Sequence, residues 1–187
     1  MNSWRVVSLQ DVASMPWRNG GGFTRELAVW PAADDWTWRM SVAEVDQSGP
    51  FSKFEGVDRW FAVLNGAGVQ LDVAGKSYPL TPSTPPFFFD GAAPVDCRLL
   101  DGKTVDFNLM VRRGSASAHM QRVAGDFENH VGATKLIAIY NRNTWAKLRF
   151  DNESLHLPPA SLAWRQVSAS TLVALTAGDA LWMEISL

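Results

Sequence analysis

Hydrophobic and polar residues alternate with a period of two along much of the chain, which is typical of β-strands that bury one face. The alternation is clearest in Trp36–Val42, Val69–Val73 and Leu181–Leu187. Trp60–Leu64 is apolar on both faces, as expected of a central strand. Further strands are predicted at Phe23–Trp30, Ser77–Leu80, Phe87–Phe89, Cys97–Leu100, Leu136–Tyr140, Lys147–Phe150, Leu155–Leu157, Leu162–Val167 and Leu172–Leu175.

These short strands recur at a spacing of roughly ten residues and are separated by turn signals such as Asn65-Gly66. The pattern predicts an all-β sandwich or jelly-roll barrel with little helix. One short helix is expected at Ser8–Ala13, with Ser8 as its cap. Ser115–Asn129 is polar and aperiodic, so we expect it to connect two halves of the chain.

The segment Met15–Leu27 has an unusual composition, with Trp, Asn, two Arg and three successive Gly in thirteen residues. Glycines let another group approach the backbone closely, and arginine is a forked donor suited to carboxylate or phosphate. A dinucleotide-binding loop is excluded because Pro16-Trp17 precedes the glycines and a strand pattern, not a helix, follows them. We predict that Met15–Leu27 forms one wall of a small-anion pocket. The alternative is a loop that needs its glycines to turn into a sheet.

A second informative stretch is Val105–Arg112, whose alternation puts Asp106, Asn108, Met110 and Arg112 on one face. This face is either a solvent-facing polar side or part of a pocket. The presence of Met110 among the polar residues favours the pocket.

Composition excludes several classes of function. The 187 residues carry a net charge of −2 and no basic run, so we expect no nucleic-acid partner. No apolar run reaches the ~18 residues of a membrane span, and the first ten residues lack a signal-peptide core. The single cysteine, Cys97, is predicted to be an inert core thiol and fits a reducing compartment. We therefore expect a cytoplasmic protein without a membrane partner.

The sequence offers little for catalysis. Its three histidines, His119, His130 and His156, are not clustered, so we predict no metal and no other cofactor. No Gly-x-Ser-x-Gly elbow is present. Acid–base chemistry could use one of four carboxyl groups, and none of them is singled out by its sequence context. These four are Glu26, Glu44, Glu55 and Asp106.

Four motifs together resemble the HutD/Ves family: Pro16–Gly22, Gly49–Ser52, Gly56–Arg59 and Asp106–Met110. The resemblance implies a cupin fold, a double-stranded β-helix or jelly roll, duplicated as a bicupin. We expect the cupin-like halves to be residues 1–114 and 115–187, packed as one compact unit. The resemblance also implies a link to bacterial histidine degradation. In that pathway the protein would bind a metabolite such as formylglutamate or urocanate and restrain the pathway.

A pocket for a small carboxylate needs cationic anchors, hydrogen-bond donors and apolar walls. Arg59 is the foremost anchor, and Arg112, at the end of its strand, is the weakest candidate. Phe51 is a further candidate for the walls. The predicted ligand-binding residues are Trp17, Arg18, Asn19, Gly21, Gly22, Thr24, Arg25, Ser52, Phe54, Arg59, Asn108 and Met110. Each arginine could instead be a structural partner of an acidic residue.

Three functions remain open at this level. The residues favour a small-molecule binding protein over an enzyme, and the resemblance implies a regulatory role for it. The first alternative is a metal-independent cupin enzyme acting on a small acid or sugar-like substrate. The second is a protein-interaction module with Thr81–Phe89 as an exposed apolar patch. The sequence does not determine the oligomeric state, and it is compatible with a homodimer.

Overall fold

The computed structural model describes residues 3–187, without the side chain of residue 177, and is nearly all β. The described residues form seventeen strands and one three-residue 3-10 helix, Leu9–Asp11, so the helix expected at Ser8–Ala13 is a single short turn. The chain divides into two compact units. The central unit is Val12–Ala116, and the terminal unit combines the N-terminal segment up to Asp11 with Ser117–Leu187.

No helix among the described residues has the length and apolar character needed to cross a membrane.

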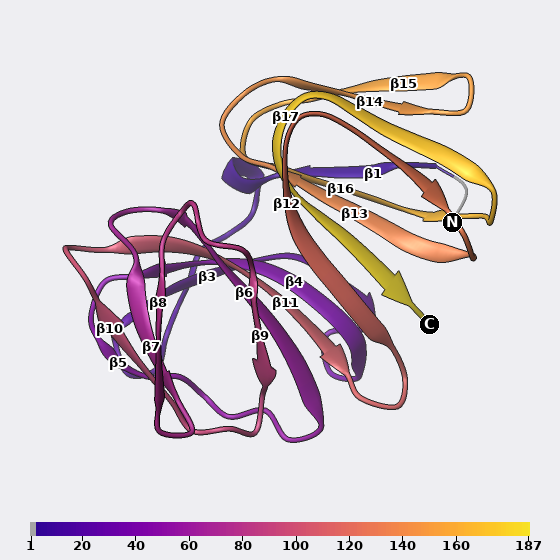
Figure 1. Ribbon diagram of the computed structural model, residues 1–187. Helices are drawn as coiled ribbons and strands as arrows, with labels where there is room; N and C mark the ends of the chain where they lie inside the picture. The colour runs from indigo at the N-terminus through magenta and orange to yellow at the C-terminus, as the bar shows by residue number, and fades with distance from the viewer. Residues whose placement is uncertain (1–2) are drawn as a thin grey trace. The chain divides into compact units, whose positions relative to one another are not determined.

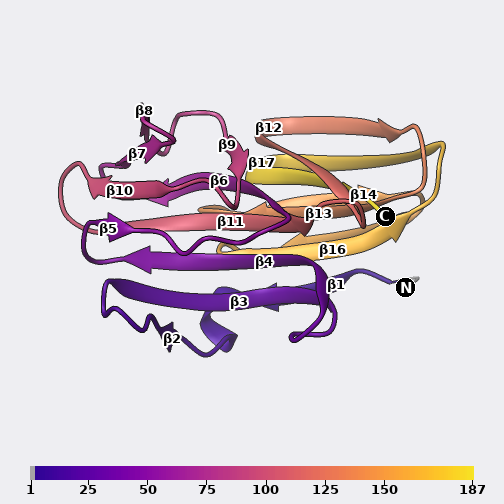
Figure 2. The same ribbon diagram turned by 90° about the horizontal axis from the view of Figure 1, so that it is seen from below.

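The central unit contains two antiparallel sheets, and Figure 2 shows β3, β4, β11 and β6 running side by side. The six-stranded sheet has the order β2 (Met15–Pro16), β3 (Gly22–Pro31), β4 (Trp36–Val45), β11 (Thr104–Arg112), β6 (Val57–Asn65) and β9 (Phe87–Asp90). The four-stranded sheet has the order β5 (Gly49–Pro50), β10 (Val95–Leu99), β7 (Val69–Val73) and β8 (Lys76–Leu80). Figure 1 shows both sheets in indigo to rose colours.

Side chains from both sheets of the central unit form one apolar core, as expected of a jelly-roll sandwich. Phe61 and Val63 of β6 belong to the same buried cluster as Leu71 of β7 and Val95 of β10. The alternation predicted for Val69–Val73 is confirmed, because its odd-numbered residues are buried and its even-numbered ones are not.

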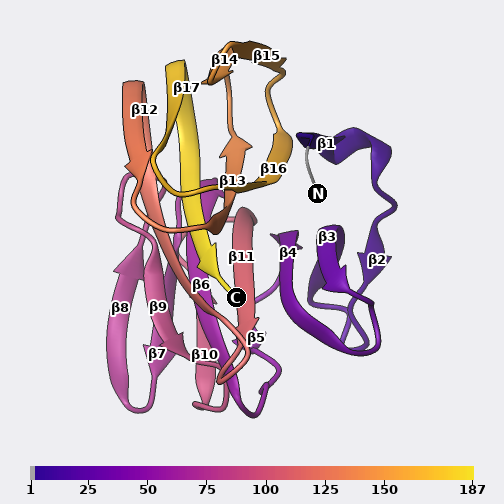
Figure 3. The ribbon, with the colours of Figure 1, turned by 90° about the vertical axis from the view of Figure 1, so that its right-hand side faces the viewer.

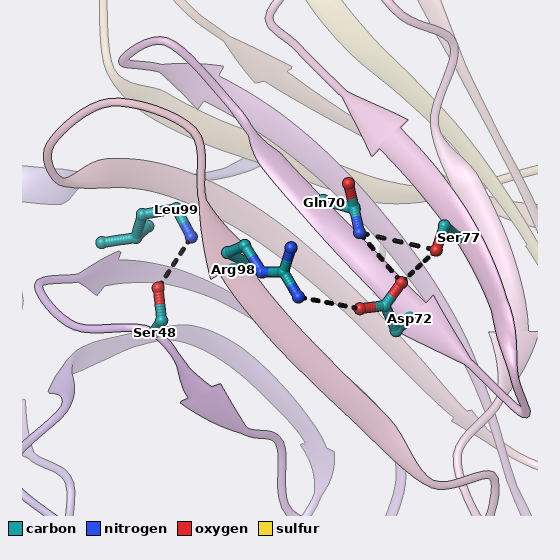
Figure 4. Close-up of polar contacts among 6 residues, drawn as sticks. All are labelled: Ser48, Gln70, Asp72, Ser77, Arg98 and Leu99. Atoms are coloured by element: carbon teal, nitrogen blue, oxygen red, sulfur yellow. Dashed lines mark hydrogen bonds and ion pairs between the residues drawn. The ribbon is translucent and has the colours of Figure 1, made fainter.

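The outward face of the four-stranded sheet is polar (Figure 4). Asp72 accepts hydrogen bonds from Ser77 and from Gln70 Nε2, the latter at 3.1 Å, and lies 4.0 Å from Arg98. The Ser77 hydrogen bond, followed by that from Gln70, lowers the pKa of Asp72 below its ordinary value. These contacts lie on the solvated surface of the sheet, on the opposite side from the buried face of β7.

The terminal unit is built on one curled seven-stranded sheet, in which β12 and β17 run side by side (Figure 3). Its apolar interior includes Ile137, Ile139, Leu148 and Trp182. The strands are β1 (Arg5–Ser8), β12 (Ser117–Val131), β13 (Lys135–Asn141), β14 (Ala146–Phe150), β15 (Glu153–Leu157), β16 (Ser161–Val167) and β17 (Thr171–Ser186).

The boundary between the two units falls between Ala116 and Ser117, inside the polar segment Ser115–Asn129, but the segment is not the aperiodic connection that was predicted. Most of it belongs to β12, which pairs along almost the whole length of β17. A register shift between Gly125 and Phe127 breaks the period of two, and several of the strand's side chains are exposed. A bulge changes the face on which successive side chains lie, which is why the hydrophobic pattern hid this strand.

The expected boundary of the halves also needs correction at the N-terminus. β1 pairs with β16 of the terminal unit, with Arg5 opposite Trp164 and Ser8 opposite Ser161. The side chain of Trp4 packs edge-on against Phe150, with ring centroids 6.1 Å apart. Pairing between strands so far apart leaves no local signal in the sequence. The pattern alone therefore could not show that the first residues of the predicted half 1–114 belong to the terminal unit.

The Thr81–Phe89 segment does not present a continuous apolar patch, which counts against the interaction module. Only Phe88 of the three phenylalanines is exposed (48%), and its ring lies 5.2 Å from that of Trp60. Phe89 is buried, and Phe87 packs against Tyr78 with ring centroids 4.5 Å apart. The alternation of β9 therefore divides the three rings between two faces.

Candidate functional site

A cavity of about 710 Å³ lies within the central unit, and its floor is the inner face of the six-stranded sheet. We call it the Arg59 cavity. Antiparallel register places Glu26, Ser41 and Asn108 in one row across β3, β4 and β11. Because residues two apart on a strand share a face, Arg39 of β4 and Arg59 of β6 lie on the same floor, each opposite Met110 of β11.

Arg59 is a buried cation without a carboxylate partner. The residue is 5% exposed, and its Nη2 donates a hydrogen bond of 2.9 Å to Asn108 Oδ1. Its Nη1 donates a longer one, 3.4 Å, to the carbonyl oxygen of Ser52, and its Nε has no partner. Of the carboxylates in the described chain, none forms an ion pair with Arg59. The structure thus leaves a buried positive charge at the cavity whose direct contacts are all neutral groups.

Three aromatic rings hold the Arg59 guanidinium in place. Its Cζ lies 4.9 Å from the ring centroid of Phe89 and 5.5 Å from those of Phe51 and Phe54. Cation–π attraction offsets part of the cost of burying the charge. Burial, and secondarily the charge of Arg39, lower the pKa of Arg59 to about 10, so the group remains a cation at neutral pH.

A second arginine and one acid face the same cavity. Arg39 Nε lies 3.2 Å from Glu26 Oε2, which makes an ion pair but lacks the geometry of a hydrogen bond. Arg18 contributes to the lining from the exposed Gly-rich segment. Three arginines against one carboxylate give the lining a positive excess, which is suited to an anion.

The Gly-rich segment forms a wall of the cavity through a compact turn. The backbone N–H of Trp17 donates to the carbonyl of Gly22 at 2.9 Å, and that of Gly20 donates to the carbonyl of Trp17 at 3.0 Å. Trp17 Nε1 donates to Thr24 Oγ1 at 2.7 Å, which fixes the indole ring beside the sheet. The turn therefore presents Trp17 and its neighbours to the cavity, as the sequence predicted for one wall.

Gly22 is required by close backbone packing. A Cβ at this position would lie 2.2 Å from the backbone oxygen of Glu44 on β4. We expect Gly22→Ala to lower the free energy of unfolding by about 1–3 kcal/mol, because β3 and β4 would have to separate. Gly21→Ala is the matched control, since the nearest atoms to its Cβ belong to the Asn19 side chain, at 3.4 Å or more. Urea unfolding of both variants measures the difference, and equal stabilities would contradict this account.

The cavity brings together nine of the twelve predicted ligand-binding residues, from segments far apart in the sequence. Whether they bind a ligand stays a prediction. The nine are Trp17, Arg18, Asn19, Thr24, Ser52, Phe54, Arg59, Asn108 and Met110. Gly21 instead borders an adjoining hollow of about 110 Å³, which it shares with Trp17 and Asn19.

Two predicted residues and one weaker candidate lie elsewhere. Arg25 is on the opposite face of β3 from Thr24, where its Nη2 lies 3.5 Å from Glu44 and its Nη1 donates to the carbonyl of Val12. The alternation of a strand requires this placement. Gly22 is buried against β4 behind the wall. Arg112 pairs with Asp35 at 3.7 Å at the end of β11.

The sequence reasoning missed Arg39 and Ser41 and considered Glu26 only as an acid or an arginine partner. The period-two pattern of Trp36–Val42 already places Arg39 and Ser41 on one face. It does not say whether that face meets solvent or a cavity, because alternation is the same in both cases.

On the polar face of β11, Asp106, Asn108 and Met110 are buried and only the terminal Arg112 is exposed, which favours the pocket over a solvent-facing side. Asn108 and Met110 line the cavity, whereas Asp106 is fully buried and absent from its lining. Thr104 Oγ1 donates to Asp106 Oδ2 at 2.8 Å, and Oδ1 has no partner. Burial, partly opposed by the Thr104 hydrogen bond, raises the pKa of Asp106 to about 7. Burial and the nearby Asp106 raise the pKa of the buried Cys97 thiol to about 12, which agrees with an unreactive core cysteine.

Within the described part of the chain, no group of three or more His, Cys, Asp or Glu side chains is placed to hold a metal ion. The described lining of the cavity includes Glu26 as its one carboxylate and no histidine or tyrosine.

Comparison with known proteins identifies close relatives of this chain. The HutD family model matches residues 9–184. Protein Ves of Cronobacter sakazakii is 34% identical over 181 residues, which cover 94% of this chain and 97% of that protein. HutD from Pseudomonas fluorescens, solved in a formate condition, is 29% identical with a TM-score of 0.83, and the match covers 98% of both chains.

More distant solved structures share the fold. An oxalate decarboxylase variant of Bacillus subtilis gives a TM-score of 0.68 at 9% identity, covering 99% of this chain and 77% of that one. At this identity the likeness concerns the fold alone, and it places the chain among proteins with a cupin-like β fold.

Proposed function

The chain belongs to the HutD family, and from this premise we propose that it binds a small carboxylate metabolite in the Arg59 cavity and has a regulatory role in histidine degradation. The names of the family and of its Pseudomonas fluorescens member support the histidine context. Formylglutamate and urocanate are the first metabolites to test. The single cysteine supports a cytoplasmic, reducing compartment for this role.

One observation carries the proposal, namely the buried Arg59 guanidinium without a carboxylate partner. A buried charge is costly unless a counter-charge accompanies it, so a carboxylate ligand would supply what the free protein lacks. A hydrogen bond to a charged group contributes about 1.5–3 kcal/mol. Together with the apolar walls at Trp17 and Phe51, such anchors would suffice for micromolar affinity.

We also propose that the two units repeat one cupin plan. In the central unit β11 lies between β4 and β6, and β10 lies between β5 and β7. In the terminal unit, one part of β17 lies between β12 and β13 and corresponds to β11. The other part lies between β12 and β14 and corresponds to β10. The pairs β7–β8 and β6–β9 likewise have counterparts in β14–β15 and β13–β16.

The shared plan need not mean two ligand sites. Where the central unit has its cavity, the interior of the terminal unit is occupied by Trp182, Ile137 and Ile139, all fully buried. We therefore propose a single site in the central unit.

Thermal unfolding in the presence of formylglutamate, urocanate, glutamate and histidine tests the proposed function. A ligand at one hundred times its dissociation constant adds about 2.7 kcal/mol, which corresponds to roughly 5–10 °C for a chain of this size. We expect a carboxylate of this panel to give such a shift, and Arg59→Ala to abolish it while remaining folded. No shift at millimolar concentration for any member would remove the proposal.

The same panel separates binding from the metal-independent enzyme. Glu26 supports this alternative, because it is a carboxylate within the cavity that could transfer a proton. Turnover of a panel member by chelator-treated protein, lost in Glu26→Gln, would establish the enzyme. Binding without turnover is the result we expect.

A further inference from the structure

We propose that the Arg59 cavity selects a monocarboxylate that also carries an N–H donor, and that Glu26 accepts this donor and rejects a second carboxylate. The inference rests on the proposed function, because it takes carboxylate binding at Arg59 as its starting point. It assigns Glu26 a role in specificity, and of the two metabolites named first it favours urocanate, a monocarboxylate with a ring N–H, over the dicarboxylate formylglutamate.

Glu26 is placed to contact the far end of a short ligand. It lies in the same row of the sheet as Asn108, with β4 between them, and Asn108 holds Arg59. Neighbouring strands are about 4.8 Å apart, so the backbones at Glu26 and Asn108 are separated by roughly 10 Å. A small molecule whose carboxylate meets Arg59 and Asn108 would extend across β4 toward Glu26.

Glu26 retains acceptor capacity. Its only ion-pair contact in the described chain is between Oε2 and Arg39 Nε, at 3.2 Å and without hydrogen-bond geometry. The side chain is 32% exposed and belongs to the cavity lining. An ionised carboxylate can only accept hydrogen bonds, so it favours an N–H or O–H of the ligand over another carboxylate.

The charges on the cavity floor agree with a singly charged ligand. Arg39 and Arg59 contribute two positive charges and Glu26 one negative charge, which leaves an excess of one. A monocarboxylate neutralises this excess. The second carboxylate of a short dianion would lie against Glu26, and two like charges placed side by side repel each other. Arg18 is exposed and offers no comparable compensation on the floor.

Matched pairs of ligands test the inference: succinate against succinamate, and glutarate against glutaramate. The members of each pair differ only in whether one end is a carboxylate or a primary amide. Calorimetric titration of the full chain at neutral pH should show that the monoamide of at least one pair binds about 10- to 100-fold more tightly than the diacid. Glu26→Gln should reduce this preference about tenfold or reverse it, because the amide side chain no longer repels a carboxylate.

Glu44→Gln is the matched control. Glu44 is similarly exposed and pairs with Arg25 on the same sheet, outside the cavity lining. We expect it to keep the wild-type preference, and Glu26→Ala provides a second variant if Glu26→Gln unfolds. Equal binding of amide and diacid, or an unchanged preference in the Glu26 variants, overturns the inference and leaves the proposed function standing. If none of the four probes binds at millimolar concentration and the metabolite panel also gives no shift, both fall.

Discussion

Arg59→Met is expected to raise the stability of the ligand-free protein and to abolish its carboxylate binding. The guanidinium is buried, has no carboxylate partner and holds an unpaired Nε, so its desolvation is only partly compensated. Methionine has a similar length and would pack among the rings of Phe51, Phe54 and Phe89. Replacing a poorly compensated buried charge by an apolar side chain should add about 1–3 kcal/mol to the free energy of unfolding.

The opposite effects on stability and binding identify Arg59 as a functional residue and not a structural one. Thermal unfolding with and without a binding carboxylate measures both: the melting temperature of the free variant should rise by roughly 2–10 °C, and the ligand-induced shift should vanish. Arg112→Met is the matched control, because Arg112 also stacks on an aromatic ring, Trp36 at 5.5 Å, but is exposed. A destabilised Arg59→Met protein, or one that still responds to carboxylates, would contradict this role.

Asp106 is expected to make the central unit less stable as the pH rises toward neutrality. Its pKa is raised from an ordinary value near 3.8 to about 7, so the folded state binds a proton that the unfolded state has released. The contribution of this group to stability is complete below about pH 4, falls between pH 4 and 7, and is lost above pH 7. The total change is at most about 4 kcal/mol, since each pKa unit corresponds to about 1.4 kcal/mol.

Denaturant unfolding of the wild type and Asp106→Asn between pH 4 and 8.5 isolates this effect from that of other carboxyl groups. We expect the variant to gain stability relative to the wild type as the pH rises, by up to several kcal/mol at pH 8. Asp72→Asn is the control. The pKa of Asp72 is lowered from 3.8, so its contribution is lost only below about pH 4, and this variant should run parallel to the wild type between pH 4 and 8.5. Parallel stability curves for the wild type and Asp106→Asn would disprove a raised pKa.

Local sequence patterns predicted much of the fold. The strands at Val69–Val73 and Phe23–Trp30 lie where alternation indicated them, because a half-buried strand leaves its signature in consecutive residues. Four motifs also identified the family correctly. The same reasoning failed at β12, where a bulge and an exposed face removed the signature, and at β1, whose partner β16 lies more than 150 residues away.

The candidate site was predictable in its composition but not in its electrostatics. Gly-rich backbone, Trp17, Arg59 and Asn108 were recognisable as parts of one pocket, and all of the named side chains line it. That Arg25 points away follows from strand alternation once β3 is recognised. The pairing of Arg39 with Glu26 could not be predicted from the sequence, because any of several carboxylates could have been the partner of a given arginine.

By itself, then, the sequence determined the β architecture, the family and the residues from which a pocket could be built, since these depend on local periodicity and short motifs. Only the tertiary structure decided which polar face is enclosed and which arginine lacks a counter-charge. Burial and charge balance arise between strands that are distant in the sequence, as for Arg59 and Asn108, which are brought within hydrogen-bond distance by β6 and β11. The energy of a buried charge depends on such neighbours and not on its position along the chain.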